Sequence, residues 1–523
     1  MTQIFPPLRR LSDTFATVLL GAVLGVAPAL SAQATAATPT AAPAVRPLAI
    51  DEALRIAEER SEGVRIARAG VLRARGQQFQ ARSQYLPQFN GSVAFVKTIQ
   101  SQFDALSKLG GGGRDTSSNS LANSPIAKIF AARQTLTLGV NGQWNLFAGG
   151  RLLAANRIAG AARRSAEIGL ASALASLKLQ VTEAYYDAGL ADQLSTIADS
   201  SLAQSERTLT QVTLAKNVGN TSEFELLRAQ VTRDNQRPSV IQRRTQRDIA
   251  LLRLKQLLDI PADEPIALAS ALTDSTIAGV AIVDVVLPNA QLADTSADGR
   301  AQVRQVAEAV TVQRNQVRIA RAQRLPGLAL STQYGKIAYP TAGIPAFNAF
   351  YPNWTVTATV SVPLFTGGRI TGDEMVARAN LTEARENYQQ TKELAALDAR
   401  SATADLEQAL AAWRASSGTS EQAAKAYRIA EVRYREGIST QLELAESRLL
   451  LEQAAANRAS AARNLKVAQV RLALIRDLPL GTVQGTSAGT GSSSGQSQAQ
   501  QSSSRAQGAS GANTTNSTGG QQE

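Results

Sequence analysis

Residues 136–151 read LTLGVNGQWNLFAGGR and decide the fold class of this chain. From residue 136 to residue 146, apolar residues and one glycine occupy the even positions, while polar residues and another glycine occupy the odd ones. This period of two predicts a β-strand with one apolar and one polar face. The flanking sequence is rich in Ala, Arg, Gln, Glu and Leu at helical spacing, so we predict a mainly helical chain with isolated strands.

The second half of the chain repeats the first. SVPLFTGGR at residues 361–369 matches QWNLFAGGR at residues 143–151, which is an offset of 218 residues. The same offset aligns Gly219 with Gly437 and the DIP at 259–261 with the DLP at 477–479. A register kept over more than a hundred residues indicates an internal duplication.

Each copy is predicted to contain a helix ending in Leu-Pro, two strands and a long helical hairpin. The strands are expected at 88–100, 133–147, 327–339 and 354–365. Long stretches without proline favour unbroken helices, and we expect helices at 50–85, 151–216, 221–259, 301–325 and 369–435. Pro238 lies inside the returning helix of the first copy and predicts a bend there.

The N-terminus has the layout of a secretory signal. Arg9 and Arg10 precede an apolar run, and small residues around Ala34 suggest a cleavage site. The last residues are almost wholly Gly, Ser, Gln, Thr, Asn and Ala, a composition typical of disorder. We therefore expect a signal peptide at 1–34, a linker at 35–47 and a disordered tail at 481–523. Between them we expect a first repeat at 48–260 and a second repeat at 301–480. An equatorial connector at 261–300 joins the repeats and is expected to contain a short strand near 281–287.

Composition excludes several classes of activity. The chain has no cysteine and no histidine, which removes disulfides, thiolate or imidazole metal sites, cysteine nucleophiles and histidine-dependent triads. We predict no enzyme activity and no cofactor. The formal charge is +12, but the arginines alternate with acidic residues and form no run. Solvated helix faces explain this pattern, so nucleic acid is not an expected partner.

The four strands raise a problem of closure. A sheet can cross a membrane only as a closed barrel, because an open edge leaves backbone groups unpaired in hydrocarbon. The smallest barrels made from one chain use eight strands. Four strands in an exported chain therefore suggest closure by several copies, and three copies supply twelve strands.

The repeated motifs resemble those of the TolC-like outer-membrane efflux proteins, the outer membrane factors. They are the Leu-Pro after the first helix, PLFTGGR at 363–369, and the turns VGNT at 218–221 and EGIS at 436–439. The resemblance spans about 48–480 in both copies. It implies a homotrimer that is mainly α with a membrane β-barrel: a 12-stranded barrel, with four strands per chain, continued by a long periplasmic α-helical coiled-coil barrel.

The resemblance also implies a function. Such a protein is the outer-membrane channel-tunnel of a tripartite efflux or type I secretion system. It passively conducts substrates from a periplasmic adaptor and an inner-membrane pump to the exterior, and it sits in outer-membrane lipid and extends into the periplasm. Drug, metal and protein cargoes all stay open at this point.

The family's functional residues map near the two turns. The resemblance implies a pore constriction at Glu443 and Glu446, and a closing latch at Tyr434. Glu225 matches Glu443 by the repeat. The latch's basic residue falls on Ser439 here and its threonine on Phe224. Either the latch is weaker in this chain, or Arg433 or Arg435 substitutes for the basic residue. The adaptor is expected to dock on the turn residues Val218, Gly219, Asn220, Thr221, Glu436, Gly437, Ile438 and Ser439.

Other interpretations stay open. Glu443 and Glu446 share a helix face because they lie three residues apart, which would stack acidic rings in a trimer. Alternatively, they are solvated helix residues that pair with Arg448 or another neighbour. The whole chain can also be interpreted as a trimeric secreted coiled-coil scaffold, or as an adhesin, without a conducting role. An adhesin, however, is expected to carry its four strands together at the C-terminus.

Overall fold

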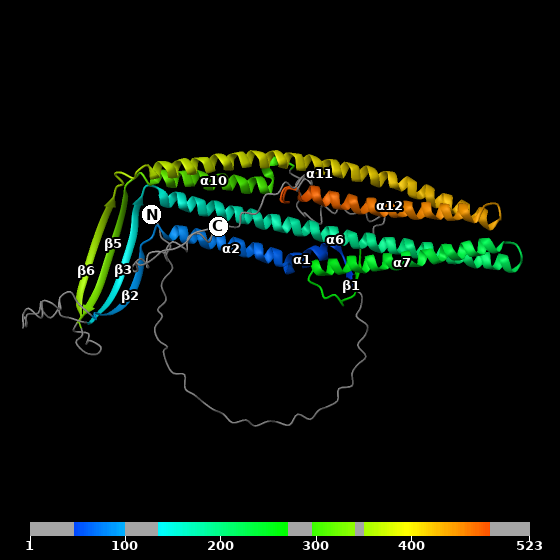
Figure 1. The fold of residues 1–523 in the computed structure, drawn as a ribbon, viewed down its shortest axis with the longest axis horizontal. Helices are drawn as coiled ribbons and strands as arrows, with labels where there is room; N and C mark the ends of the chain where they lie inside the picture. The colour runs from blue at the N-terminus through cyan, green and yellow to red at the C-terminus, as the bar shows by residue number, and fades with distance from the viewer. Residues whose placement is uncertain (1–45, 100–133, 270–294, 340–349, 482–523) are drawn as a thin grey trace, which may run out of the picture.

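The computed structural model describes residues 46–99, 134–269, 295–339 and 350–481. Figure 1 shows an elongated molecule with a four-stranded sheet at one end and long helices that run from it to two tight turns at the other. The signal peptide, the strand expected near 281–287 and all but the first residue of the C-terminal tail lie outside the described residues.

The sheet joins the two hairpins of the duplicated halves. Its strands run antiparallel in the order β2-β3-β5-β6. The four strands expected from the period-two pattern are confirmed, with boundaries that differ by a few residues. They are β2 (Gln88–Lys97), β3 (Gln134–Ala148), β5 (Gly327–Ala338) and β6 (Tyr351–Ser361).

The strand register puts the apolar residues of all four strands on one face. Val93 lies opposite Leu138, and Val140 lies opposite Tyr334, which in turn lies opposite Trp354. A bulge between Asn145 and Phe147 changes the phase near the end of β3. Phe147 then lies opposite Leu328, and Leu146 is the extra residue of the bulge. One extra residue in a bulge reverses the alternation beyond it.

The expected helices are confirmed with one division. The stretch 50–85 forms two helices, α1 (Ile50–Arg60) and α2 (Glu62–Ser83). They separate at Ser61, whose backbone is extended. The Ser61 side-chain oxygen caps α2 by accepting a hydrogen bond from the amide of Val64. The others are α6 (Arg151–Asn217), α7 (Glu223–Leu257), α10 (Ala301–Ala322), α11 (Arg369–Arg435) and α12 (Gln441–Leu474).

Pro238 does not interrupt the helix that contains it. α7 is continuous from Glu223 to Leu257, and Figure 1 shows no sharp bend along it. The expected visible bend is therefore wrong. The proline removes one backbone donor, but the helix packs along α6 for most of its length, and tertiary packing holds it straight.

The helices next to the sheet keep the order of the strands they join. α6 contacts α2 on one side and α10 on the other, and α10 contacts α11. α7 packs on α6, and α12 packs on both α11 and α6. Within the described residues, no helix is long and apolar enough to cross a membrane.

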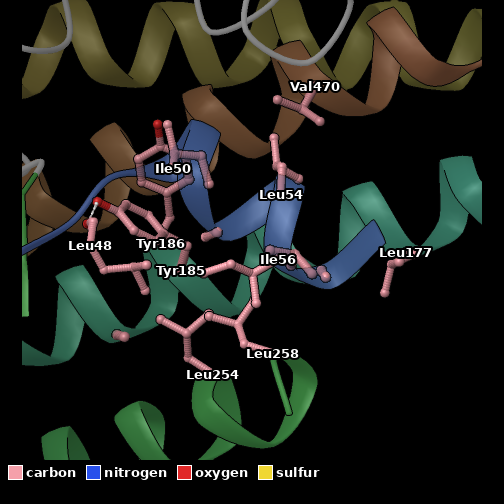
Figure 2. Packing of buried hydrophobic residues seen from close by; sticks show 14 of the residues in the cluster. Leu48, Ile50, Leu54, Ile56, Leu177, Tyr185, Tyr186, Leu254, Leu258 and Val470 are labelled. Carbon is pink, nitrogen blue, oxygen red and sulfur yellow. Dashed lines mark hydrogen bonds between the residues drawn. The ribbon is translucent and has the colours of Figure 1, made fainter. Parts of the chain in front are cut away.

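The main hydrophobic core lies partway along the helices. There, β1 (Arg46–Leu48) pairs in parallel with β4 (Ile266–Leu268), although the sequence predicted no strand at either position. Figure 2 shows Leu48, Tyr185, Leu254 and Leu258 packed together in this core, and the Tyr185 hydroxyl donates a 3.0 Å hydrogen bond to the carbonyl oxygen of Leu48. The core therefore ties the start of the first copy to α6 and α7.

A buried ion pair ties the start of the second copy in place. Arg300, which precedes α10, is fully buried, and its Nη2 lies 2.6 Å from Oδ2 of Asp398 in α11. Arg471 of α12 also reaches Asp398, at 3.4 Å. A charge so buried is tolerated only when it is paired, so this contact fixes the position of α10 against α11 and α12.

Truncation of Leu254 tests the contribution of the core. Leu254 is fully buried, so Leu254→Ala is expected to destabilise the protein by about 2–5 kcal/mol through lost burial and a residual cavity. Leu252→Ala is the matched control, because Leu252 is 46% exposed two residues away. Thermal unfolding of the full chain in detergent, followed by far-UV circular dichroism, measures both. Equal shifts for the two variants would contradict this assignment of the core.

Candidate functional site

The two helical turns at the far end have the same backbone structure. Gly219 and Gly437 adopt positive φ angles of 80° and 71°. After α6, the amides of Gly219 and Asn220 donate to the carbonyls of Lys216 (2.9 Å) and Ala215 (2.8 Å). This pair of bonds is a Schellman motif, and a glycine suits its left-handed position.

The turn after α11 repeats this arrangement. The amides of Gly437 and Ile438 donate to the carbonyls of Tyr434 (3.1 Å) and Arg433 (2.8 Å). Each turn is then followed by a hydroxyl residue that caps the returning helix. Both tips are therefore rigid, equivalent structures rather than loose loops.

The helix caps explain the position of Glu225 and Glu443. Ser222 and Thr440 each precede a returning helix, and their hydroxyls accept 3.3 Å hydrogen bonds from the amides of Glu225 and Glu443. A carboxylate in the first turn also interacts favourably with the positive end of the helix dipole. These two glutamates thus have a local structural role in addition to any role in a pore.

The predicted constriction residues lie in different environments. Glu443 and Glu446 are exposed, whereas Glu225 is partly buried. Gln441 of α12 is buried, and with its amide nitrogen facing Glu225 it donates to Glu225 Oε2 at 2.6 Å and to the Glu225 carbonyl at 3.2 Å. Glu225 therefore joins the first returning helix to the second.

Tyr434 packs in a small apolar cluster between α11 and α12. Its neighbours there are Tyr427, Ala430 and Leu444. Burial raises the pKa of the Tyr434 hydroxyl, and the nearby charge of Glu225 raises it further. The hydroxyl is therefore protonated at neutral pH. The structure thus brings Tyr434 and Glu225 close together and leaves Glu443 and Glu446 exposed in the single chain.

Arg448 points to α6 and not to the exposed glutamates. It donates a hydrogen bond to the hydroxyl of Ser205, and one helical turn further on Glu452 accepts a 3.1 Å bond from Ser201. The suggested pairing of Arg448 with Glu443 or Glu446 is therefore wrong. Burial lowers the pKa of Arg448 below its usual value. Of the proposed latch substitutes, Arg435 pairs with Glu431 of its own helix at 3.8 Å, and Arg433 is exposed.

The sequence patterns did not predict the contacts that Gln441 and Arg448 make with the first hairpin. Both residues join hairpins whose partners lie more than two hundred positions away, so no local pattern marks them. A polar residue on a helix face that otherwise carries leucine and alanine was the only available signal.

Apolar side chains are exposed at both ends of the molecule. At the tips, Val218, Phe224 and Ile438 are each about two-thirds exposed. On the sheet, the apolar face contains five residues that are 61–74% exposed: Phe89, Val93, Trp354, Val356 and Val360. Contiguous exposed apolar surface marks an interface with a membrane or with another protein.

Together, a small sheet with one exposed apolar face and duplicated hairpins, each with one 67-residue helix, give the architecture of an outer-membrane efflux channel protein. The chain belongs to the outer membrane efflux protein family, whose model matches residues 53–259 and 292–475. The predicted family relationship is confirmed.

Solved structures share the fold. The MtrE outer membrane channel of Neisseria gonorrhoeae, in its open state, superposes with a TM-score of 0.66 at 19% identity, covering 84% of this chain and 91% of that chain. VceC of Vibrio cholerae gives 0.63 at 19% identity, covering 82% and 95%. The Campylobacter jejuni CmeC channel gives 0.61 at 16%, covering 82% and 86%. No curated protein matches the sequence. The family and these neighbours are channel proteins, not enzymes.

Alanine at the tip glycines tests the turn geometry. Because a Cβ disfavours a positive φ, Gly219→Ala and Gly437→Ala are each expected to destabilise the local turn by about 1–2 kcal/mol. Hydrogen exchange at the amides of Asn220 and Ile438 measures this as faster exchange. Gly418→Ala, in the exposed interior of α11, is the control and should stabilise its helix by up to about 1 kcal/mol. Unchanged exchange at both turns would contradict the assigned strain.

Proposed function

We propose that three copies of this chain close a 12-stranded barrel in the outer membrane, and that their helices continue it as a tunnel through the periplasm. The tunnel passively conducts substrates that a periplasmic adaptor and an inner-membrane pump deliver. The observation that carries this proposal is the sheet, which exposes an apolar face and ends in two strands, β2 and β6, each paired on one side only within the described residues.

The unpaired edges support closure by further copies. Lipid offers no hydrogen-bond partner for a strand edge, so β2 of one chain must pair with β6 of the next chain in the trimer. The helices agree with this arrangement, because the outer helices of the layer expose large apolar residues for a neighbouring copy to cover. On α2 these are Ile66, Leu72 and Phe79, and on α11 they are Met375, Val376, Leu394 and Leu397.

The tips are the proposed docking and gating region. Val218, Gly219, Asn220 and Thr221, with Glu436, Gly437, Ile438 and Ser439, present a rigid polar and apolar surface to an adaptor. Glu443 and Glu446 project from the next turn and are exposed in the single chain. In a trimer they provide two acidic rings at the narrow end, which would favour cations. Glu225 joins the two hairpins of one chain through Gln441, and Tyr434 packs between the helices of the second hairpin.

A scaffold or adhesin without a conducting role is less well supported. In a soluble scaffold, the exposed side chains of the sheet, such as Trp354 and Val356, would face water over a contiguous area. The strands also come from two separate segments, residues 88–148 and 327–361, that join in one sheet, unlike the strands expected of an adhesin.

Conductance in a planar bilayer tests the proposal. The purified mature protein is expected to form a pore, and Glu443→Ala with Glu446→Ala is expected to lower its cation preference because two acidic rings are removed. Glu383→Ala with Glu386→Ala is the matched control, since these exposed glutamates have the same spacing on α11 far from the tips.

Three results are informative. A change in the tip variant alone supports both channel and constriction. The same change in both variants indicates that Glu443 and Glu446 are ordinary solvated residues of a helix face and do not form a constriction. A folded trimer, verified by native mass spectrometry, that forms no pore would contradict the channel proposal.

A further inference from the structure

Three neighbouring helices beside the sheet each carry a net positive charge. α2 carries five arginines and one glutamate. The first twenty residues of α6 carry four arginines and one glutamate, and so does the whole of α10. The first twenty residues of α11 carry three arginines against four acidic residues. The stretches on α2, α6 and α10 are therefore each net positive, as is α7 away from the sheet, which carries eight basic residues and four acidic ones.

A cleft of about 360 Å³ lies where these three helices meet. Arg157 and Arg164 line it from α6, and Arg314 and Arg318 line it from α10. The members of each pair lie seven and four residues apart, so each pair projects from one face of its helix. Gln78 contributes the wall on the α2 side.

The arginines of this cleft are mostly not neutralised. Arg164 makes a two-bond contact with Glu308, with its Nε and Nη2 at 2.7 and 2.8 Å from the two carboxylate oxygens. Arg318 donates only to the neutral Asn315, at 3.2 Å. In the part of the chain that the structure describes, Arg157 and Arg314 make no ion pair or hydrogen bond. Within the described residues, the carboxylates near these groups, those of Glu308 and Glu167, both act on Arg164, and the other three guanidinium groups have no ion pair.

We propose that this cleft binds a phosphate-bearing anion. Four like charges in one concave site repel one another, and an anion with two or more acceptor oxygens relieves that repulsion. Guanidinium groups match phosphate oxygens through paired, charge-assisted hydrogen bonds. Burial of Asn315 and the Glu308 contact hold Arg318 and Arg164 in place before a ligand arrives.

The position of the cleft allows two sources for the phosphate. At 1.5 Å per residue, Arg157 and Arg164 lie roughly 9 and 20 Å along α6 from the end of the sheet. This is the depth of lipid headgroups and of the water just beneath them if the sheet spans a membrane. The ligand is then either the phosphate of an anionic lipid or a soluble phosphate. The site itself does not require channel function, and only the lipid source depends on the proposed membrane position.

Binding of two probes by the full-length chain distinguishes these sources. Isothermal titration calorimetry in detergent measures the binding of inorganic pyrophosphate. Native mass spectrometry measures how much cardiolipin the protein retains, compared with phosphatidylethanolamine. For at least one probe, Arg157→Gln with Arg314→Gln is expected to weaken binding by at least about tenfold, because two charge-assisted contacts are lost. Both residues are exposed and make no ion pair or hydrogen bond within the described residues, so the variant should unfold at the wild-type temperature.

Arg385→Gln with Arg414→Gln is the matched control. Both residues are exposed on α11, outside the cleft, and their replacement removes the same charge. Loss of pyrophosphate binding only in the cleft variant identifies a soluble-phosphate site, and selective loss of cardiolipin identifies a lipid-headgroup site. Equal losses in the cleft and control variants, or no binding of either probe by the wild type, would overturn the proposal. Neither measurement depends on conductance, so a failure of the anion-binding proposal can be told apart from a failure of the proposed channel function.

Discussion

Backbone hydrogen bonding at the two edges of the sheet is the constraint on which the remaining architecture depends. β2 and β6 each pair on one side within the described residues, and the apolar face between them is exposed. In water this surface would invite aggregation, and in lipid it would leave donors and acceptors unsatisfied. The proposed trimer satisfies both requirements at once, because copies of one chain complete the ladder while lipid covers the apolar face.

The duplication extends this solution along the molecule. Each strand pair leads into a helical hairpin, and each hairpin ends in a Schellman turn followed by a capping hydroxyl. The copies are not equivalent in every respect, because α12 contacts α6 as well as α11. The Gln441 to Glu225 bonds and the Arg448 to Ser205 bond make this asymmetric contact near the tips. Any opening of the tips that separates the hairpins must break these bonds.

Most of the fold could be predicted from the sequence because its signals are local and periodic. The alternation in β3, the proline-free stretches of α6 and α11, and the glycines at the tips each determine structure within a few residues. The division at Ser61, the bulge before Phe147 and the β1–β4 pair were not predicted, since each depends on a cap or on tertiary pairing. The cleft around Arg157 and Arg314 also depends on tertiary packing, which joins residues from distant segments.

The most direct test of the central claim is the accessibility of alternate β6 positions in a bilayer. The chain has no cysteine, so single spin labels at Val356→Cys and Thr357→Cys are free of background. If the sheet is the wall of a water-filled barrel, the label at 356 should collide mainly with oxygen dissolved in lipid, and the label at 357 mainly with a water-soluble nickel chelate. Equal access of the chelate to both labels would contradict the membrane position of the sheet.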